Sequence, residues 1–414
     1  MKLLSGEEAA RAVASLAHRY ASLDPAAEKS VAAIVERVRS GGDAALLDYA
    51  HTFDGLAQDT PMRVSDEELQ AALGMVSPEF IRAIEIAARN IRNFAEWQLP
   101  RPWIRTIHPG LRVGQVIRPL ESVACYAPGG RYPLPSTVLM TVIPAQVAGV
   151  KRIAVASPRP APETLAAAAI LGVTEFYRIG GAQAIAAFAY GTQSIAPVNK
   201  IVGPGNIYVT LAKKLVAFDC GIDFLAGPTE IVYCATEGNP EFIASDLVAQ
   251  AEHDPEALAI FVTASTRLAK AVIKCTAAMA AGNAIASQSL AARGVVLVAK
   301  SRKQAIEWTN ELGGEHVTVP SEDVYDIKCA GSIFLGDYTP QSLGDYASGP
   351  NHTLPTGNMA RCRGGLNVID FVRIITLQES NRKGLEKIAP TVTLLAEAEG
   401  LKGHAESVRV RMKK

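Results

Sequence analysis

The chain has 414 residues, of which 49% are hydrophobic and 20% charged, a composition typical of compact proteins with roughly two to four domains. Its 41 basic residues are balanced by 41 acidic ones, so no net field favours nucleic acid or an anionic membrane as a partner. Small-molecule chemistry is therefore the favoured class of function.

The six cysteines stand far apart and form no CxxC pair, which favours reduced, mostly buried thiols over a zinc ribbon or a redox motif. The N-terminal "MKLLSGEEAARAV" turns acidic before an apolar run reaches signal-peptide length. Uninterrupted apolar windows of about eighteen residues, as a membrane span needs, are also absent from the sequence. We therefore expect a cytoplasmic protein that does not insert into a membrane.

Apolar residues recur at three- and four-residue spacing through most of the first hundred residues, which predicts helices. Ser65 with Glu68 predicts a capping box, and Ser77-Pro78 places proline at the first position of the next helix. We expect this part to be structural.

In the middle of the chain, short β-branched runs alternate with alanine-rich helical runs. Strands that open near Arg152, Glu175 and Lys200 recur about every two dozen residues, the length of a short βα unit. A similar alternation follows between residues 240 and 319. The pattern predicts an α/β fold with two units of doubly wound parallel sheet, whose ligands bind at the carboxyl ends of the strands. The last fifty residues are expected to be helical and to end in a β-like "ESVRVRM".

Glycines mark three of the strand-to-helix turns, at Gly129-Gly130, Gly180-Gly181 and the "GPGN" of residues 203–206. Each turn could receive a phosphate or a dinucleotide, because glycine allows close approach and a helix N-terminus favours negative charge. Each could equally be an ordinary tight βα turn. A GxGxxG fingerprint follows none of these strands.

Gln250 and His253 stand three residues apart in "DLVAQAEHDPEA", in what is predicted to be the last turn of a helix. That spacing places both side chains on one face, as a pair of metal ligands would be. The alternative is a histidine at a helix C-terminus, where the macrodipole favours a cation and Asp254-Pro255 ends the helix.

Further polar residues in the second half could join such a site. Glu315 and His316 enter a strand after a Gly-Gly turn and could place an acid and a base at one strand mouth. Asp345 and His352 lie in "GDYASGPNHTLPTG", a segment without strand or helix periodicity, and His404 follows near the C-terminus. Histidines with an aspartate and a glutamine form a plausible set of zinc ligands. For each histidine, a packed or solvated imidazole remains the alternative.

Long blocks of the sequence resemble the histidinol dehydrogenase family, in the same order and over nearly the whole length. They include "VACYAPGGRYPLPSTVLMTVIPAQVAGVKRI", "RIGGAQAIAAFAYGT", "SDLVAQAEHDP", "GDYASGPNHTLPTG" and "AEGLKGHAESVRVR". The resemblance implies a zinc-dependent enzyme that oxidises L-histidinol through the aldehyde to L-histidine. Such an enzyme uses two NAD molecules per turnover and one zinc ion per site, in the last steps of histidine biosynthesis.

The resemblance also implies roles for individual residues. Glu315 and His316 match the acid/base pair, and His352 falls outside the ligand set. The matched zinc ligands, which also contact substrate, are Gln250, His253, Asp345 and His404. Further matched substrate contacts are Thr229, His316 and Glu399. The matched NAD contacts are Tyr126, Gln183 and Asn206.

The fold implied by the resemblance is a pair of incomplete Rossmann-like domains with small terminal pieces that exchange across a homodimer. His404 and Glu399 would then reach the partner's site. The implied division is an N-terminal piece (1–15), a discontinuous first domain that carries zinc and the catalytic residues (16–120 and 231–365), an inserted NAD-binding domain (121–230) and a C-terminal exchange piece (366–414).

Three positions depart from the usual family pattern: Thr229 replaces a serine, Gly-Gly precedes Glu315 where a proline is common, and a valine follows His316 where leucine is common. One alternative is therefore a paralogous zinc- and NAD-dependent dehydrogenase that acts on a different small amino or sulfonated alcohol. A catalytically silent metabolite- or metal-binding protein is disfavoured, because both acid/base residues and all four ligand positions are filled.

Overall fold

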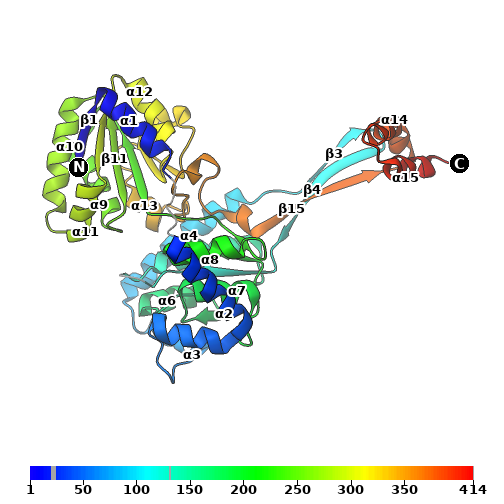
Figure 1. Ribbon diagram of the computed structural model, residues 1–414, viewed down its shortest axis with the longest axis horizontal. Helices are drawn as coiled ribbons and strands as arrows, with labels where there is room; N and C mark the ends of the chain where they lie inside the picture. Colours follow the sequence, from blue (N-terminus) through cyan, green and yellow to red (C-terminus); the bar gives the residue numbers. More distant parts are fainter. Residues whose placement is uncertain (20–24, 130–131, 414) are drawn as a thin grey trace.

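The computed structural model describes residues 1–19, 25–129 and 132–413. Two α/β bodies, each built on a six-stranded sheet, are accompanied by a long three-stranded arm that carries the C-terminal helices (Figure 1). The predicted fold class, with doubly wound parallel sheets, is confirmed. Within the described ranges, none of the helices is both long and apolar enough to span a bilayer.

The first body, termed body A, contains a sheet with strand order β1-β12-β11-β10-β13-β14, all parallel. Its strands are β1 (Lys2–Ser5), β10 (Glu230–Cys234), β11 (Leu258–Thr263), β12 (Val295–Val298), β13 (His316–Val319) and β14 (Ser332–Leu335). Helices α1 (Gly6–Ala17) and α12 (Arg302–Leu312) pack on one face. The other face is covered by α9 (Pro240–Ala251), α10 (Thr266–Ala280) and α11 (Ala284–Ala292). The short α13 (Gln341–Tyr346) follows β14.

The second body, body B, has strand order β2-β7-β6-β5-β8-β9. Its strands are β2 (Arg63–Val64), β5 (Ser122–Tyr126), β6 (Arg152–Ala156), β7 (Glu175–Tyr177), β8 (Lys200–Val202) and β9 (Gly221–Ile222). Among these described strands, the edge strand β2 pairs antiparallel with β7, and the other pairs are parallel. One face carries α3 (Asp66–Leu73), α4 (Pro78–Gln98), α5 (Pro135–Ala148) and α6 (Pro162–Ile170). The other carries α2 (Pro25–Tyr49), α7 (Gly181–Tyr190) and α8 (Ile207–Val216). The three predicted strand starts are confirmed.

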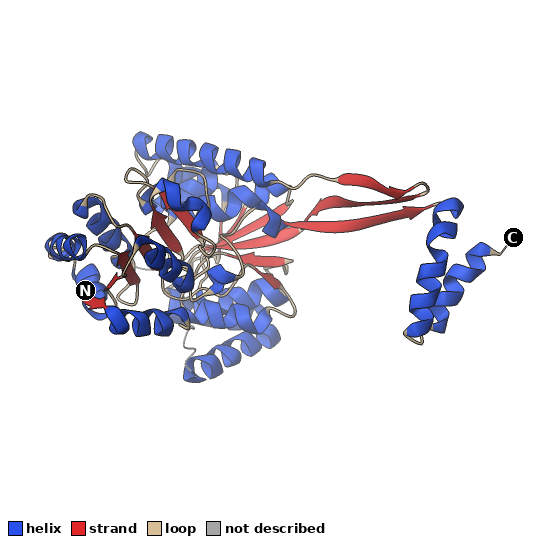
Figure 2. Cartoon of the chain, turned by 90° about the horizontal axis from the view of Figure 1, so that it is seen from above, coloured by secondary structure: helices blue, strands red, loops and turns tan. Residues whose placement is uncertain are grey.

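An antiparallel sheet of β3 (Trp103–His108), β4 (Leu111–Pro119) and β15 (Val372–Ser380) forms the arm. Helices α14 (Arg382–Ala398) and α15 (Lys402–Met412) pack on each other at its far end, away from both bodies (Figures 1 and 2). The predicted β-like end was wrong. "ESVRVRM" lies in α15, where Ala405 and Val408, three residues apart, are buried and override the local alternation of valine and arginine.

The helices of the N-terminal hundred residues are shared between the two bodies in a way that differs from the expected domain boundaries. Instead of joining residues 231–365, α2, α3 and α4 cover both faces of the sheet in body B. Residues 1–15 are not a separate piece, because β1 pairs in parallel with β12 and α1 packs on the same sheet. Long-range strand pairing and burial decide these placements, and helical periodicity does not report them. Gly130, one of the expected turn glycines, lies outside the described residues.

Candidate active site

The predicted acid/base pair stands at the entrance to β13, beside the start of β10. Glu315 Oε2 accepts hydrogen bonds from Thr229 Oγ1 (2.5 Å) and from the backbone N–H of Glu230 (2.7 Å). The His316 ring lies between two acceptors, with Nδ1 3.2 Å from the Glu230 carbonyl oxygen and Nε2 3.3 Å from Asp345 Oδ1. Both side chains are buried, at 6% and 4% exposure. The structure therefore brings together an acid, a base and the hydroxyl of Thr229, which is a predicted substrate contact.

This cluster lies at the amino ends of the strands in body A, so the expectation of a site at their carboxyl ends was wrong for this sheet. Glu315 and His316 stand where β13 begins, and Thr229 immediately precedes β10. Asp345 reaches the same edge from α13, a helix that the sequence pattern did not predict. The helices that follow parallel strands run back toward the amino edge, so side chains in their last turns point there.

Opposing charges surround the His316 imidazole. Burial alone would lower the pKa of His316, but the carboxylates of Glu315 and Asp345 outweigh it and raise this pKa to about 10. Burial alone would raise the pKa of Asp345, but its hydrogen bond with His316 and the nearby His352 and His253 lower it. The cluster is thus rich in negative charge that a cation can share.

A third carboxyl, which the sequence analysis missed, lies close enough to the cluster to interact with Asp345. Asp246 lies on α9, and burial together with the charge of Asp345 raises its pKa to about 7. Its backbone carbonyl accepts a hydrogen bond from Gln341 Nε2 (3.0 Å), which joins α9 to α13. Its place in an apolar helical run gave no local signal of this role.

The predicted metal ligands are gathered only in part by a single chain. Gln250 is fully buried near the end of α9, and its Nε2 donates to Thr229 Oγ1. His253 is exposed in the turn just after that helix, and its charge acts on Asp345. His404 and Glu399 are exposed and belong to the remote C-terminal helices (Figure 1). Across residues 1–19, 25–129 and 132–413, no three His, Cys, Asp or Glu side chains come together as a metal site.

One atom of the cluster is nevertheless suited to a cation. The Gln250 Oε1 atom is buried and accepts no hydrogen bond from the described residues. A buried carbonyl oxygen without a partner is costly. A bound metal ion would satisfy it, and the neighbouring Asp345 carboxylate and His253 imidazole are also ordinary ligands of zinc. The residues present therefore fit a divalent metal.

The three predicted dinucleotide contacts lie at the carboxyl ends of β5, β7 and β8 in body B, beside the glycine turns that the sequence marked. Tyr126 ends β5, and its hydroxyl accepts from the Gly181 N–H (3.2 Å), while burial raises the pKa of Tyr126 to about 12. Gln183 lies in the first turn of α7, and Asn206 caps α8 through its side-chain oxygen. A Cβ on Gly203 would stand 2.1 Å from the Tyr126 carbonyl oxygen, so only glycine allows these turns to pack together.

Asp54, which no sequence pattern marked, bonds two of the groups at this edge of body B. It is buried at the end of the helical run after α2, and its Oδ2 accepts from the Gly180 N–H (3.0 Å) and from Gln183 Nε2 (3.1 Å). Burial raises the pKa of Asp54, and these two hydrogen bonds partly offset the effect. The carboxylate thus fixes the turn and the side chain that are predicted to meet the dinucleotide.

Replacing Asp54 by alanine is expected to weaken dinucleotide binding more than catalysis. The change leaves the Gly180 N–H and the Gln183 amide without their acceptor, a loss of about 1–3 kcal/mol. We expect the KM for NAD to rise about tenfold, as 1.4 kcal/mol corresponds to tenfold, with kcat nearly unchanged. Asp43→Ala is the matched control, because this carboxylate, also on body B, bonds the exposed Ser194. Initial-rate kinetics with varied NAD measure both, and an unchanged KM in Asp54→Ala would contradict the role.

The two bodies meet beside the acid/base cluster. His352 Nδ1 lies 2.8 Å from the Asp345 carbonyl oxygen, and its Nε2 lies 3.2 Å from Thr137 Oγ1 in the first turn of α5. Burial lowers the pKa of His352. Because α5 starts at the carboxyl edge of body B, this contact joins that edge to the amino edge of body A. A dinucleotide on one body could thus face an acid/base pair on the other.

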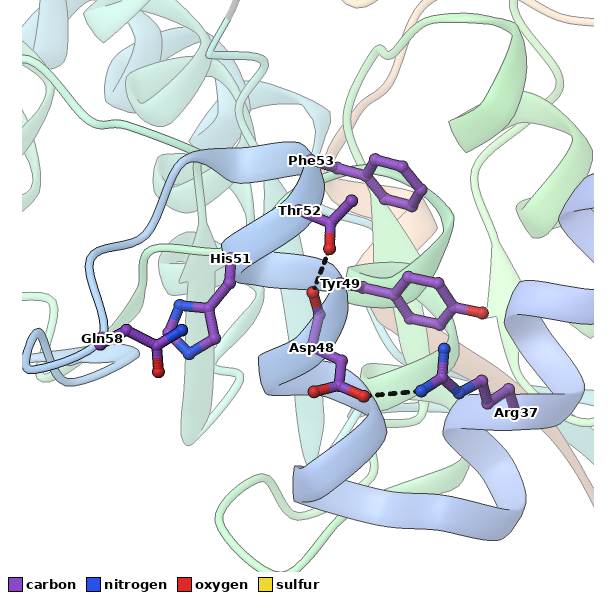
Figure 3. A pocket seen from close by; sticks show the side chains of 7 residues that line it. All are labelled: Arg37, Asp48, Tyr49, His51, Thr52, Phe53 and Gln58. Carbon is purple, nitrogen blue, oxygen red and sulfur yellow. Dashed lines mark hydrogen bonds and ion pairs between the residues drawn. The ribbon is translucent and has the colours of Figure 1, made fainter.

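A separate hollow of about 380 Å³ lies on the N-terminal helices (Figure 3). Its polar groups mostly pair locally: Arg37 bonds Asp48 at 2.6 Å, and the Thr52 hydroxyl donates to the Asp48 carbonyl oxygen. His51 Nδ1 lies 2.7 Å from the Leu56 carbonyl oxygen, as expected for a satisfied side chain. None of the predicted site residues lines it, so the junction between the bodies remains the better candidate.

Comparisons with known proteins agree with the resemblance over nearly the full length. The model of a family described as histidinol dehydrogenase matches residues 17–412. The histidinol dehydrogenase of Methanothermobacter thermautotrophicus is 45% identical over 92% of this chain and 93% of that protein. That of Aquifex aeolicus is 44% identical over 96% and 95%. The crystal structure of histidinol dehydrogenase from Elizabethkingia anophelis superposes with a TM-score of 0.94 at 36% identity, covering 100% of this chain and 98% of that one.

Proposed function

Since the chain belongs to the histidinol dehydrogenase family, we propose that it oxidises L-histidinol to L-histidine in two NAD-linked steps through L-histidinal, with one zinc ion per site. The observation that carries this proposal is the buried Glu315–His316 pair beside the unpartnered carbonyl oxygen of Gln250. Both steps need a base, the second also needs a group that activates water, and the orphaned oxygen suits a metal that holds the substrate.

His316 is the base of the proposed reaction. The Glu230 carbonyl oxygen lies near Nδ1, which favours a proton on that nitrogen and leaves Nε2 to take the proton of the substrate alcohol. While Asp345 neutralises a bound cation, its carboxylate no longer raises the pKa of His316 to the same extent. The pKa of His316 then lies below the value of about 10 that the carboxylates of Glu315 and Asp345 together give it, which favours the neutral ring that accepts a proton.

Glu315 serves the second oxidation. Its carboxylate is oriented by Thr229 and by the Glu230 N–H, and it takes a proton from the water that hydrates the aldehyde. His316 then removes a proton from the hydrate as the second hydride leaves. Thr229 also lies within reach of Gln250, so the threonine that replaces the usual serine retains the hydroxyl that links acid and ligand.

Four residues would hold the zinc: Gln250, His253 and Asp345 of one chain and, we propose, His404 of a second copy. When bound, the metal would fix the imidazole and amino nitrogens of histidinol and thus position the reacting carbon. Tyr126, Gln183 and Asn206 would bind NAD at the facing edge of body B, and Glu399 would contact the substrate.

The proposed homodimer follows from the arm. Its strands and terminal helices expose large apolar side chains that soluble monomers rarely gather, including Ile107 at 61%, Leu394 at 67% and Leu395 at 59%. A twofold exchange of arms would cover such surface and bring His404 and Glu399 to the partner's site. All six cysteines are free thiols, which agrees with the cytoplasm as the place of action.

Metal removal tests the proposed chemistry. We expect protein stripped with a chelator to lose nearly all turnover of L-histidinol and to regain it with zinc, because the substrate is no longer positioned. Gln250→Ala should need more zinc for half-maximal reactivation, roughly 10- to 100-fold as for other lost support of a metal site. Gln304→Ala is the control, because this half-buried glutamine of α12 bonds the Lys300 N–H and, within the part of the chain that the structure describes, none of the predicted site residues. Stripped protein that remains fully active would contradict a zinc role, and turnover of another amino or sulfonated alcohol in place of histidinol would indicate a paralogue.

A further inference from the structure

A partly buried arginine outside the predicted site forms bonds to the segments that enter β10 and β13, where the acid/base pair stands. Arg19 follows α1, with its side chain 14% exposed, and forms a two-pronged ion pair with Glu230 through Nε (2.7 Å) and Nη2 (2.5 Å). The Glu230 side chain is 6% exposed. We propose that Arg19 and Glu230 are positioning residues for catalysis, an inference that rests on the proposed function of Glu315 and His316.

Glu230 is joined to both reacting residues through its backbone. Its N–H donates to Glu315 Oε2 at 2.7 Å, and its carbonyl oxygen lies 3.2 Å from His316 Nδ1. A shift of this one peptide segment would therefore misplace the acid and turn the ring of the base together. The side chain of Glu230 is what Arg19 holds, so the arginine acts on the reacting groups through this residue.

The same guanidinium also fixes the approach to β13. Arg19 Nη1 donates to the Leu312 carbonyl oxygen (2.7 Å), and Nη2 lies 3.4 Å from that of Gly313. Gly313 adopts φ +54, a left-handed conformation that glycine tolerates, and it ends α12 two residues before Glu315. One side chain thus ties together the entrances to β10 and β13, and the Gly-Gly pair before Glu315 supplies a carbonyl for it.

A third segment, at Gly357 and Asn358, also bonds the ion pair. The Gly357 N–H donates to Glu230 Oε1 (3.1 Å), and Asn358 Oδ1 lies 3.3 Å from Arg19 Nη1. Asn358 Nδ2 donates in turn to the Ala17 and Arg19 carbonyl oxygens at 2.8 and 2.9 Å. A buried ion pair contributes little net stability compared with apolar residues. A role in holding three segments in register gives this pair a function beyond stability.

A cavity of about 420 Å³ adjoins the pair and is lined in part by Arg19, Glu230, Gly357, Leu4 and Val295. Removal of the arginine side chain would enlarge it next to an uncompensated carboxylate. A small guanidinium ion could enter that space and form the same two-pronged contact. The geometry therefore allows chemical rescue, which separates positioning from a general loss of folding.

The test compares Arg19→Ala with the parent enzyme in the presence and absence of ethylguanidinium. We expect kcat with histidinol, per folded protein, to fall about 100-fold, the effect of a small misplacement of reacting groups, while the KM for NAD stays within twofold. Ethylguanidinium should raise the kcat of Arg19→Ala at least tenfold, whereas ethylammonium and urea should not. Arg19→Lys should fall between, because an ammonium cannot form the two-pronged contact.

Arg293→Ala is the matched control, since Arg293 lines the same cavity but forms an exposed ion pair with Glu256. It should keep the parental kcat and show no response to ethylguanidinium. A kcat of Arg19→Ala within twofold of the parent, or rescue by urea as strong as by ethylguanidinium, would overturn the inference.

Hydrogen exchange separates this result from a failure of the proposed function. In Arg19→Ala, peptides that cover residues 227–232 and 312–319 should exchange faster and slow again with ethylguanidinium, while β11 does not change. If the parent enzyme does not oxidise histidinol, the proposed function fails, and this exchange pattern still decides whether Arg19 holds the two entrances. Unchanged exchange in both peptides would refute it.

Discussion

Replacement of His316 by asparagine is expected to lower the rates of both oxidations by about 10³-fold, within the range for loss of a positioned acid/base group. The imidazole lies between the Glu230 carbonyl and Asp345, and an amide of similar size can take part in hydrogen bonds there but cannot accept a proton. Single-turnover assays that start from L-histidinol and from L-histidinal measure the two steps separately.

Glu315→Gln distinguishes the two oxidations. Glutamine can still accept from Thr229 or Glu230, but it cannot take a proton from water, so the step from histidinal should slow far more than the step from histidinol. Ser245→Ala, a substitution of an exposed hydroxyl on α9 that bonds the Phe242 carbonyl oxygen, is a control for changes near the site.

Full activity of His316→Asn in either step would refute the role of His316 as the base.

Mixing two inactive variants should restore activity if the arm completes the partner's site. His404→Ala removes a ligand delivered to the other chain, whereas His316→Asn disables the chain's own site. Each variant alone should be nearly inactive. After joint refolding in equal amounts, half of the dimers are mixed and each mixed dimer has one intact site of two, so about a quarter of the parental activity should return.

The control for this experiment is a mixture of His316→Asn with Asp345→Ala, two changes on the same body of the chain. No dimer of these variants has an intact site, because each chain carries a defect in its own body, and activity should not return. If His404→Ala with His316→Asn also stays inactive despite formation of mixed dimers, exchange of arms is not how the site is completed.

Local patterns in the sequence were enough to predict the class of the two large sheets and several of their strands. Strands were predicted to open near Arg152, Glu175 and Lys200, and they begin at these residues, because β-branched runs between alanine-rich helices have few other interpretations. The contact among Glu315, His316 and Asp345 is also found in the structure, although the residues were grouped by chemistry and resemblance without knowledge of their distances.

Features that depend on contacts between distant parts of the chain could not be predicted from the sequence. Helices α2, α3 and α4 join body B because their apolar faces fit its sheet, and nothing in their periodicity distinguishes one sheet from another. Arg19, Asp54 and Asp246 act through partners distant in sequence, such as Glu230, more than two hundred residues beyond Arg19. A charged residue in a helical region is usually exposed, so burial, which the sequence does not report, was the missing signal.

The most direct test of the central claim is the number of NADH molecules formed for each L-histidinol consumed. Zinc-loaded protein is given limiting histidinol and excess NAD, with NADH followed by absorbance and the products separated by chromatography. One site that performs both oxidations predicts two NADH and one L-histidine per histidinol, with no aldehyde released. One NADH with accumulation of L-histidinal, or no NADH at all, would contradict the account.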